Sequence, residues 1–401
     1  MGVRPLGTSY DLVIIGAGLA GFMAAAQALA SGKKVLVVAA GQGSVTLQHG
    51  GVSLPRSGNL AAFAAATPRH PLALIGAEQV LRSLEHFRHL TQAIGLPYAL
   101  DLQGIPTLTP TLGQRLVHLL PPTLADLRQT ESLLIVGWRG FWDFLPLAPR
   151  LSRIRIRSRL VDFPHPAALA NAVALGRAMD QPAVRQTIAQ AVQPHLAGCQ
   201  LGLFPQLGLE DPVGCQHHLQ SLLGCPVAEL PALPPSLPGT RLWSRLREHL
   251  RRQGARFEIG HKVVAARTQG GRCHAITVHG LTRDVTYSAQ AFVLATGGLI
   301  GGGLQFQKGE LREPIFNLVV PPPKDGWTRR GFFDPQGHPL FSLGLVVDRR
   351  LRPLGANGEP LYDNVFACGE VLGGGTPLTG QSAEALAIAT GEAAARSVHA
   401  G

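Results

Sequence analysis

A glycine-rich turn near the start of the chain constrains the fold more than any other feature of the sequence. Residues 10–15 form a continuous apolar run that is typical of a buried parallel strand. The sequence Gly-Ala-Gly-Leu-Ala-Gly follows at 16–21 and leads into an Ala- and Leu-rich stretch, 19–30, that predicts a helix. A second apolar run lies at 34–38. This order predicts one βαβ unit.

The same turn predicts a site for a phosphate-bearing cofactor. The first two glycines permit a tight turn and the close approach of a ligand, and the third permits close packing of helix on strand. The backbone amides of the turn then point at the ligand from the positive end of the helix. A purely structural turn is the alternative, but the flanking strand and helix favour the cofactor. The candidate contacts are Gly16, Gly18, Leu19, Ala20 and Gly21.

The end of the second strand lacks the acidic residue that commonly accepts hydrogen bonds from an adenosine ribose. Ala39 and Ala40 stand there, and no arginine is present to bind a 2′-phosphate. Two alternatives follow. Either the site holds a dinucleotide with a weaker ribose contact, or it holds a mononucleotide, which has no adenosine.

Two later strands that end in small residues favour a flavin over a nicotinamide. Residues 291–298 and 365–370 both run from an apolar strand into glycine, which lets the backbone approach a cofactor. Glu370 is placed to accept a hydrogen bond from a ribityl hydroxyl, and the loop 373–382 opens a helix whose positive end suits a reduced flavin. The candidate contacts are Val263, Ala295, Thr296, Gly297, Gly369, Glu370, Gln381 and Ser382.

The segment 44–53, after the second strand, is predicted to pass the flavin ring. It is similar to a stretch of the succinate dehydrogenase and fumarate reductase family, in which an earlier histidine binds the flavin covalently. Ser44 stands near that place here, so the comparison implies a non-covalent flavin. His49 is a candidate acid–base group or flavin hydrogen-bond donor, with a structural role as the alternative. The cofactor contacts expected here are Ser44, Gly50 and Gly51.

Arg312 lies in a polar run, 308–315, within apolar sequence. A guanidinium suits phosphate or carboxylate, which makes Arg312 a candidate anion clamp. The alternative is a pair between Arg312 and Glu313 that braces the loop before Pro314.

The length of 401 residues predicts two or three domains. The composition, with 45% hydrophobic and 15% charged residues, is typical of a globular protein. After about Gly58 the sequence pattern changes to short helix-forming stretches that alternate with proline-rich turns. Another buried-strand pattern lies at 131–137. We therefore expect an α/β fold. Its parts are a Rossmann-like flavin-binding domain of the glutathione-reductase and succinate-dehydrogenase type, split into 1–60 and 236–401, and an inserted α/β cap or substrate domain at 61–235.

Composition argues against several other classes. The net charge is +11, but the basic residues are scattered and aromatic residues make up only 6%, so we expect no nucleic-acid partner. Five cysteines without a Cys-x-x-Cys pair argue against a disulfide framework, a zinc ribbon or a chain-encoded iron–sulfur cluster. Without a secretory signal or a span-length apolar run, we expect a cytoplasmic protein with no metal site, at most peripheral to a membrane.

Across nearly its whole length the chain resembles one family, the B subunit of the anaerobic, quinone-linked glycerol-3-phosphate dehydrogenase. The resemblance implies FMN rather than FAD, and a role in oxidising sn-glycerol 3-phosphate to dihydroxyacetone phosphate. It also implies assembly with a catalytic flavoprotein A subunit and an iron–sulfur C subunit at the inner face of the membrane, with a quinone as acceptor. The segments that carry it are 11–21, 107–113, 134–144, 233–242, 302–315 and 364–374.

Two other functions stay open at this point. A fumarate reductase or succinate dehydrogenase-like enzyme acting on a dicarboxylate would need convergent His and Arg residues in the insert, and the sequence shows no such cluster. A non-catalytic subunit could bind flavin only to relay electrons or to act as a scaffold. The chain departs from the family near His49 and in the loop 376–384, where ring and substrate contacts are expected.

Overall fold

The chain divides into two compact units, each of which is described by itself. Unit 1 comprises Met1–Ser44, Ser53–Leu90 and Arg245–Gly401, and unit 2 comprises Val45–Val52 and Thr91–Ser244. The structure, a computed structural model, describes residues 9–55, 59–109, 113–141, 154–230, 236–280, 283–324, 326–331, 334, 337–374 and 383–399.

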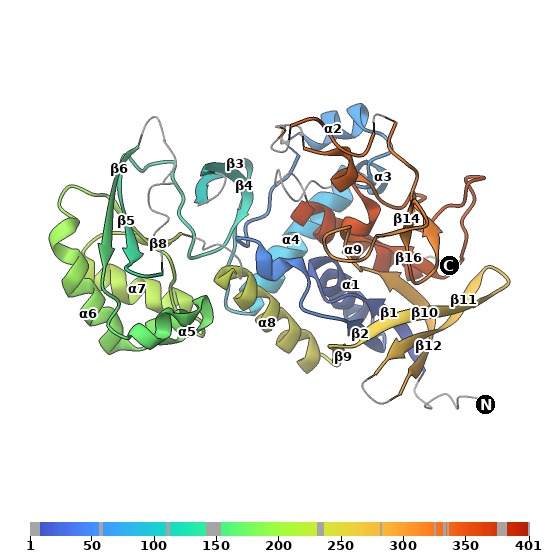
Figure 1. Cartoon of the computed structure of the whole chain (residues 1–401), viewed down its shortest axis with the longest axis horizontal. Helices are drawn as coiled ribbons and strands as arrows, with labels where there is room; N and C mark the ends of the chain where they lie inside the picture. Colours follow the sequence, from blue (N-terminus) through green and yellow to red (C-terminus); the bar gives the residue numbers. More distant parts are fainter. Residues whose placement is uncertain are drawn as a thin grey trace. The chain divides into compact units, whose positions relative to one another are not determined.

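A seven-stranded sheet forms the core of unit 1 (Figure 1). In its parallel part, β1 (Tyr10–Ile15) lies between β12 (Val285–Leu294) and β2 (Val35–Ala39). Next to β2 lies β9 (Arg256–Ile259), and next to β12 lies β16 (Val365–Ala367). The strands β10 (Lys262–Gln269) and β11 (Arg272–His279) form a hairpin that pairs with the first half of β12.

The register of the parallel strands brings the predicted cofactor segments together. Ile14 of β1 pairs with Val293 on one side and with Val37 on the other, and the central strands are buried on both faces. Because parallel strands end at the same edge of a sheet, the residues after β1, β12 and β16 are neighbours in space. The βαβ unit and the α/β fold class expected from the sequence are confirmed.

Helices of unit 1 cover this sheet. The helix α1 (Leu19–Ala30) packs against α9 (Ala383–His399), and the contact is so close that a Cβ at Gly391 would lie 2.3 Å from the carbonyl oxygen of Ala20 (Figure 1). The other helices are α2 (Leu60–Ala66), α3 (Pro71–Ile75) and α4 (Ala77–Ala93), and a small sheet holds β13 (Gln305–Gln307), β14 (Glu310–Glu313) and β15 (Leu318–Val319). In the part of the chain that the structure describes, no helix is long and apolar enough to cross a membrane.

The unit boundaries differ from those expected from the sequence pattern. Residues 60–90 belong to unit 1, whereas the pattern places the start of the insert at residue 61. A contact far apart in sequence explains this, because His86 Nδ1 of α4 lies 3.0 Å from Glu392 Oε2 of α9. Similarly, 236–244 belong to unit 2, where the Ser236 amide donates to the Thr46 carbonyl.

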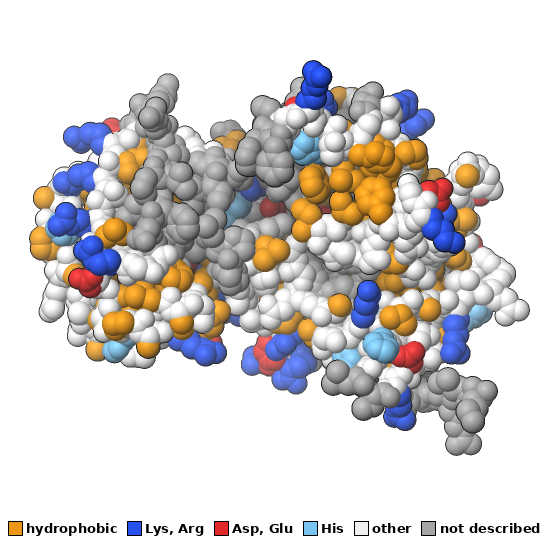
Figure 2. Space-filling model, viewed as in Figure 1, with side chains coloured by type: hydrophobic (Ala, Val, Ile, Leu, Met, Phe, Trp, Pro, Cys, Tyr) orange, Lys and Arg blue, Asp and Glu red, His pale blue; other side chains and the backbone are white. Residues whose placement is uncertain are grey.

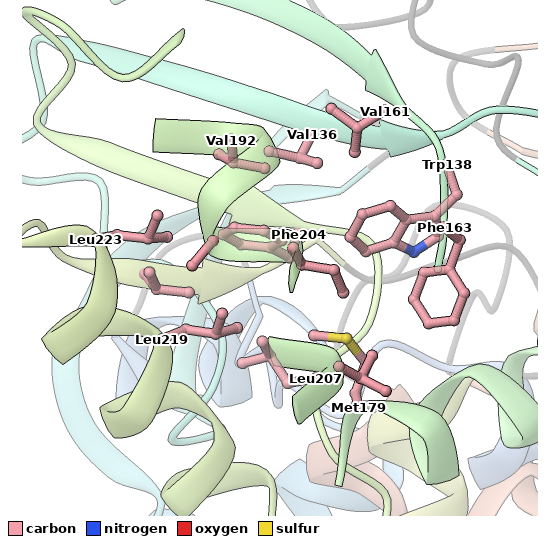
Figure 3. Close-up of a cluster of buried hydrophobic side chains, with 14 of the residues drawn as sticks. Val136, Trp138, Val161, Phe163, Met179, Val192, Phe204, Leu207, Leu219 and Leu223 are labelled. Atoms are coloured by element: carbon pink, nitrogen blue, oxygen red, sulfur yellow. The ribbon is translucent and has the colours of Figure 1, made fainter. Parts of the chain in front are cut away.

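Unit 2 is itself an α/β structure. Its four-stranded sheet is parallel and has the order β6 (Arg155–Val161), β5 (Ser132–Trp138), β7 (Leu201–Phe204) and β8 (Val227–Glu229). An apolar cluster that includes Trp138, Phe163 and Phe204 lies between this sheet and the helices (Figure 3). Unit 2 also contains the hairpin of β3 (Ala99–Thr109) and β4 (Gly113–Leu120) and the helices α5 (Ala172–Met179), α6 (Pro182–Val192), α7 (Pro212–Leu223) and the first half of α8 (Leu237–Arg252).

Basic side chains on the surface are dispersed and many are paired. Figure 2 shows Lys and Arg side chains singly or in small groups, with Asp and Glu among them. In unit 2, Arg128 pairs with Asp126 and Asp101, and in unit 1 Arg251 and its neighbour Arg252 pair with Glu248. Much of the positive charge is therefore used in local ion pairs.

A buried ion pair links the end of β8 to α8 within unit 2. Arg241 donates to both carboxylate oxygens of Glu229, at 2.6 and 3.0 Å, and both side chains are at most 1% exposed. The Thr123 hydroxyl and the Leu207 amide also donate to this carboxylate. Such a pair is costly to break, because removal of one partner leaves a buried charge uncompensated.

Substitution Glu229→Ala is expected to lower the free energy of unfolding of unit 2 by about 3–5 kcal/mol. The measurement is a urea titration followed by far-UV circular dichroism. The matched control is Glu248→Ala, which removes an exposed carboxylate with two arginine partners and should change stability little. Equal effects of the two substitutions would contradict the prediction.

Candidate functional site

The turn after β1 has the geometry of a nucleotide-binding turn. Gly16 has a φ of +123°, and a Cβ there would lie 2.1 Å from the Ala295 carbonyl oxygen at the end of β12. A Cβ at Gly21 would lie 2.0 Å from the Gly16 carbonyl oxygen. By contrast, the Cβ position of Gly18 has no heavy atom of the described residues within 4 Å. Two glycines are therefore required by packing, while Gly18 faces open space that a ligand can enter.

The positive end of α1 lies at this open space. Gly18 is the N-cap residue, no side chain caps the helix, and its first turn holds no acidic residue. The turn after β2 approaches from the other side, since a Cβ at Gly43 would lie 2.8 Å from the Gly18 Cα. Uncapped amides at a helix N-terminus stabilise an anion, so this cradle suits a phosphate.

The ends of β12 and β16 lie at the same cradle. Gly369 has a φ of +75° and a Cβ there would lie 2.8 Å from the Cβ of Ala20 in α1. The Gly298 backbone is hydrogen-bonded to Glu370, and a Cβ at Gly298 would contact the same residue. Segments separated by hundreds of residues thus meet at the turn, with Ala295, Thr296 and Gly297 between them.

Two polar side chains in the cradle suit a bound nucleotide. The Thr296 Oγ1 is buried and has no hydrogen-bond partner among the described residues. Burial raises the pKa of Glu370, and the nearby Glu384 carboxylate raises it further. A buried hydroxyl without a partner is rare in native proteins, and a cofactor hydroxyl or ring atom would satisfy it. The residues present therefore fit a flavin nucleotide.

The end of β2 offers no carboxylate to an adenosine ribose. Ala39 is buried, and its carbonyl oxygen accepts hydrogen bonds from the amides of Gly260 and His261. Ala40 is exposed. Val263, an expected cofactor contact, is buried near the start of β10 in the same unit.

His49 lies in unit 2, next to the β3–β4 hairpin. Its Nδ1 accepts a hydrogen bond from the Gly51 amide at 3.0 Å, and its Nε2 lies 2.7 Å from Arg115 Nη1. Burial, with a further contribution from the Arg115 charge, lowers the pKa of His49 to about 3. The imidazole is therefore neutral at neutral pH, which is the form that can accept a proton.

Sequence reasoning missed Arg115. It stands 66 residues after His49 in a strand of alternating polar and apolar residues, where an exposed arginine is ordinary. The only signal was indirect, since the neighbouring segment 107–113 is among those that resemble the family.

Arg312 is engaged by neighbours on its own small sheet. Its guanidinium donates to Glu310 Oε2 and to the Asn317 side chain, the latter at 2.9 Å. The carboxylate of Glu313 instead accepts from the amides of Ile315 and Phe316, so the Arg312–Glu313 pair is replaced by an Arg312–Glu310 pair. An anion would have to displace Glu310, and the role of Arg312 as a clamp stays a prediction.

The remaining predicted contacts fall into three places. Ser44 begins the short 3-10 helix η1 (Ser44–Leu47) at the end of a segment of unit 1. Gly50 and Gly51 belong to unit 2, where a Cβ at Gly51 would lie 3.0 Å from a Val117 methyl group. Gln381 and Ser382 lie outside the described residues. Among those that the structure describes, no three His, Cys, Asp or Glu side chains are grouped to hold a metal ion.

Comparisons with known proteins agree with this geometry. A family described as FAD binding domain matches residues 11–382. The chain is 31% identical over 402 residues to the B subunit of the anaerobic glycerol-3-phosphate dehydrogenase of Pectobacterium carotovorum subsp. carotovorum (strain PC1), covering 92% of this chain and 93% of that protein. The chain belongs to the FAD binding domain family and to the family of B subunits of anaerobic glycerol-3-phosphate dehydrogenase.

Other similar proteins extend this comparison. The B subunit of the same dehydrogenase from Aliivibrio fischeri (strain MJ11) is 27% identical over 436 residues, covering 97% of this chain and 95% of that protein. Among solved structures, the open conformation of a flavocytochrome c3 fumarate reductase aligns with a TM-score of 0.48 and 12% identity, covering 98% of this chain and 79% of that chain. The flavin-binding oxidoreductase expected from the sequence is confirmed by the family membership.

Substitution Gly18→Val is expected to remove the flavin and leave the fold intact, because the new side chain enters a space that no atom of the described part of the chain occupies. The measurement is the flavin-to-protein ratio from absorbance, together with the melting temperature. Gly331→Val, at an exposed glycine whose Cβ position lies 4.0 Å from the Asp334 backbone nitrogen, serves as control and should retain its flavin. Full flavin content in Gly18→Val would show that the cofactor does not lie on this turn.

Proposed function

We propose that this chain is the flavin-binding B subunit of a quinone-linked glycerol-3-phosphate dehydrogenase and that it oxidises sn-glycerol 3-phosphate to dihydroxyacetone phosphate. The observation that carries the proposal is the assembled cradle of Gly16, Ala295 and Gly369. It occurs in a chain whose similarity to a B subunit of this dehydrogenase extends over 92% of its length.

When bound, a flavin supplies the acceptor for the two electrons of such an oxidation. The chain's own residues have other tasks. The amides at the start of α1 bind the cofactor phosphate, and Glu370 and Thr296 orient the ribityl chain of the flavin. His49 is proposed as the acid–base group for the substrate hydroxyl. The unprotonated Nδ1 of its neutral ring would take up the proton in place of the hydrogen bond from the Gly51 amide.

We infer that the flavin is FMN. Ala39 and the exposed Ala40 stand where a dinucleotide site commonly carries a ribose-binding carboxylate. The only acidic residue of the adjacent strand β9, Glu258, is paired with Arg256. FAD, which the name of the matched family specifies, is the alternative.

The proposed assembly includes a catalytic flavoprotein A subunit and an iron–sulfur C subunit, with a quinone as the final acceptor. The designation of the relatives as B subunits supports the presence of partner subunits. We propose that the complex holds this chain at the inner face of the cell membrane from the cytoplasmic side.

Heating the purified chain is expected to release one flavin with the mass of FMN. Mass spectrometry of the supernatant identifies it, and the protein pellet should keep no yellow colour because the flavin is not covalently bound. Release of FAD would contradict the mononucleotide, while a folded and colourless protein would contradict the flavin site itself.

Anaerobic addition of sn-glycerol 3-phosphate to the purified flavin-loaded chain is expected to bleach the flavin absorbance near the visible maximum. Glycerol and succinate serve as controls and should leave the spectrum unchanged. Bleaching that requires the added A subunit would assign the oxidation to that partner and leave this chain an electron relay. Bleaching by succinate would favour a dicarboxylate enzyme.

A further inference from the structure

The β3–β4 hairpin of unit 2 carries a polar cluster that the flavin cradle does not use. It consists of Thr107 on β3, Arg115 on β4 and His49, which lies against the hairpin. We propose that these three side chains form a binding site for the phosphate group of a phosphate monoester substrate. The identity of that substrate as glycerol 3-phosphate rests on the function proposed above.

The register of the hairpin places two of these side chains side by side. Thr107 pairs directly with Arg115 across the antiparallel strands, and Ile105 pairs with Val117 on the same face. Residues directly opposite each other have Cβ atoms about 4.5–5.5 Å apart. The side chains of Thr107 and Arg115 therefore project from the same face of the hairpin, directly across from each other.

The Thr107 hydroxyl is the first sign of a ligand. Thr107 is 1% exposed, and its Oγ1 has no hydrogen-bond partner in the described part of the chain. Its strand neighbours on that face are apolar, since Ile105 and Val117 are buried in one hydrophobic cluster. A buried hydroxyl without a partner destabilises the fold. We therefore infer that a bound ligand forms a hydrogen bond with the Thr107 hydroxyl.

The contact between His49 and Arg115 is the second sign. Because Nδ1 of His49 accepts from the Gly51 amide, the single proton of the neutral ring stands on Nε2. That Nε2 lies 2.7 Å from Arg115 Nη1, and a guanidinium can only donate. Two donor nitrogens are thus in contact with no acceptor between them. An oxyanion placed beside them accepts a hydrogen bond from each.

A phosphate monoester suits this cluster better than a neutral ligand. A guanidinium, an imidazole N–H and a hydroxyl offer donors from three directions, which match the several oxygens of a tetrahedral dianion. A bound dianion would also offset the charge of Arg115, which contributes to the low pKa of His49.

The test is isothermal titration of the flavin-loaded full chain with inorganic phosphate, sn-glycerol 3-phosphate and glycerol. Both phosphate compounds are expected to bind and glycerol is not. Thr107→Val should weaken phosphate binding about tenfold and Arg115→Gln by about a hundredfold, in line with hydrogen bonds to charged groups.

Matched variants separate binding from folding. Thr187→Val removes a hydroxyl on α6 that bonds its own helix, and Arg128→Gln removes an arginine that is paired with two aspartates, so neither should change phosphate binding. Thr107→Val should also keep or raise the melting temperature, because it replaces an unpartnered buried hydroxyl by a methyl group. A threonine with only a structural role would not combine retained stability with weakened binding.

The outcomes of this test are distinct from those for the proposed function. Unchanged phosphate binding in Thr107→Val and Arg115→Gln, or no phosphate binding in a flavin-loaded wild-type chain, overturns the site and leaves the flavin function standing. Phosphate binding that both substitutions weaken supports the site. If sn-glycerol 3-phosphate then binds without bleaching the flavin, the site stands and the proposed oxidation is wrong.

Discussion

The close approach of the 16–21 turn to the end of β12 is the constraint on which unit 1 depends. No Cβ fits at Gly16 beside the Ala295 carbonyl, or at Gly21 beside the Gly16 carbonyl. Glycine at both positions lets α1 begin directly over the carboxyl edge of the sheet, with its amides uncapped. The glycines after β12 and β16 then close the cradle around the same point, where the positive end of the helix suits a phosphate.

The two units offer different kinds of anion-binding group. Unit 1 offers backbone amides and the end of a helix, which carry no net charge. In unit 2, Arg115 brings a full charge and His49 a neutral ring whose pKa is lowered by burial and by that charge. We propose the cofactor phosphate as the ligand of the first kind of site and a substrate phosphate as the ligand of the second.

Two expectations that depend on which side chains pair differ from what the structure shows, whereas the expected fold class is confirmed. The expected partner of Arg312 was Glu313, but Glu313 binds the backbone of its own turn and Glu310 takes its place. The alternation along a short strand puts Glu310 and Arg312 on one face and Glu313 on the other. Similarly, residues 60–90 join unit 1 because α4 reaches Glu392, a partner 306 positions away from His86.

The sequence by itself determined the βαβ unit, the three glycine-rich segments of the cradle and the flavoprotein class, because each is written in a local pattern of apolar runs and glycines. Only the tertiary structure decided that His49, Arg115 and Thr107 are neighbours. Their proximity depends on the register of β3 on β4 and on the path of the chain after β2, which no local pattern encodes. Contacts between segments that are distant in sequence form only when the whole unit packs, and that packing brings these three polar side chains together.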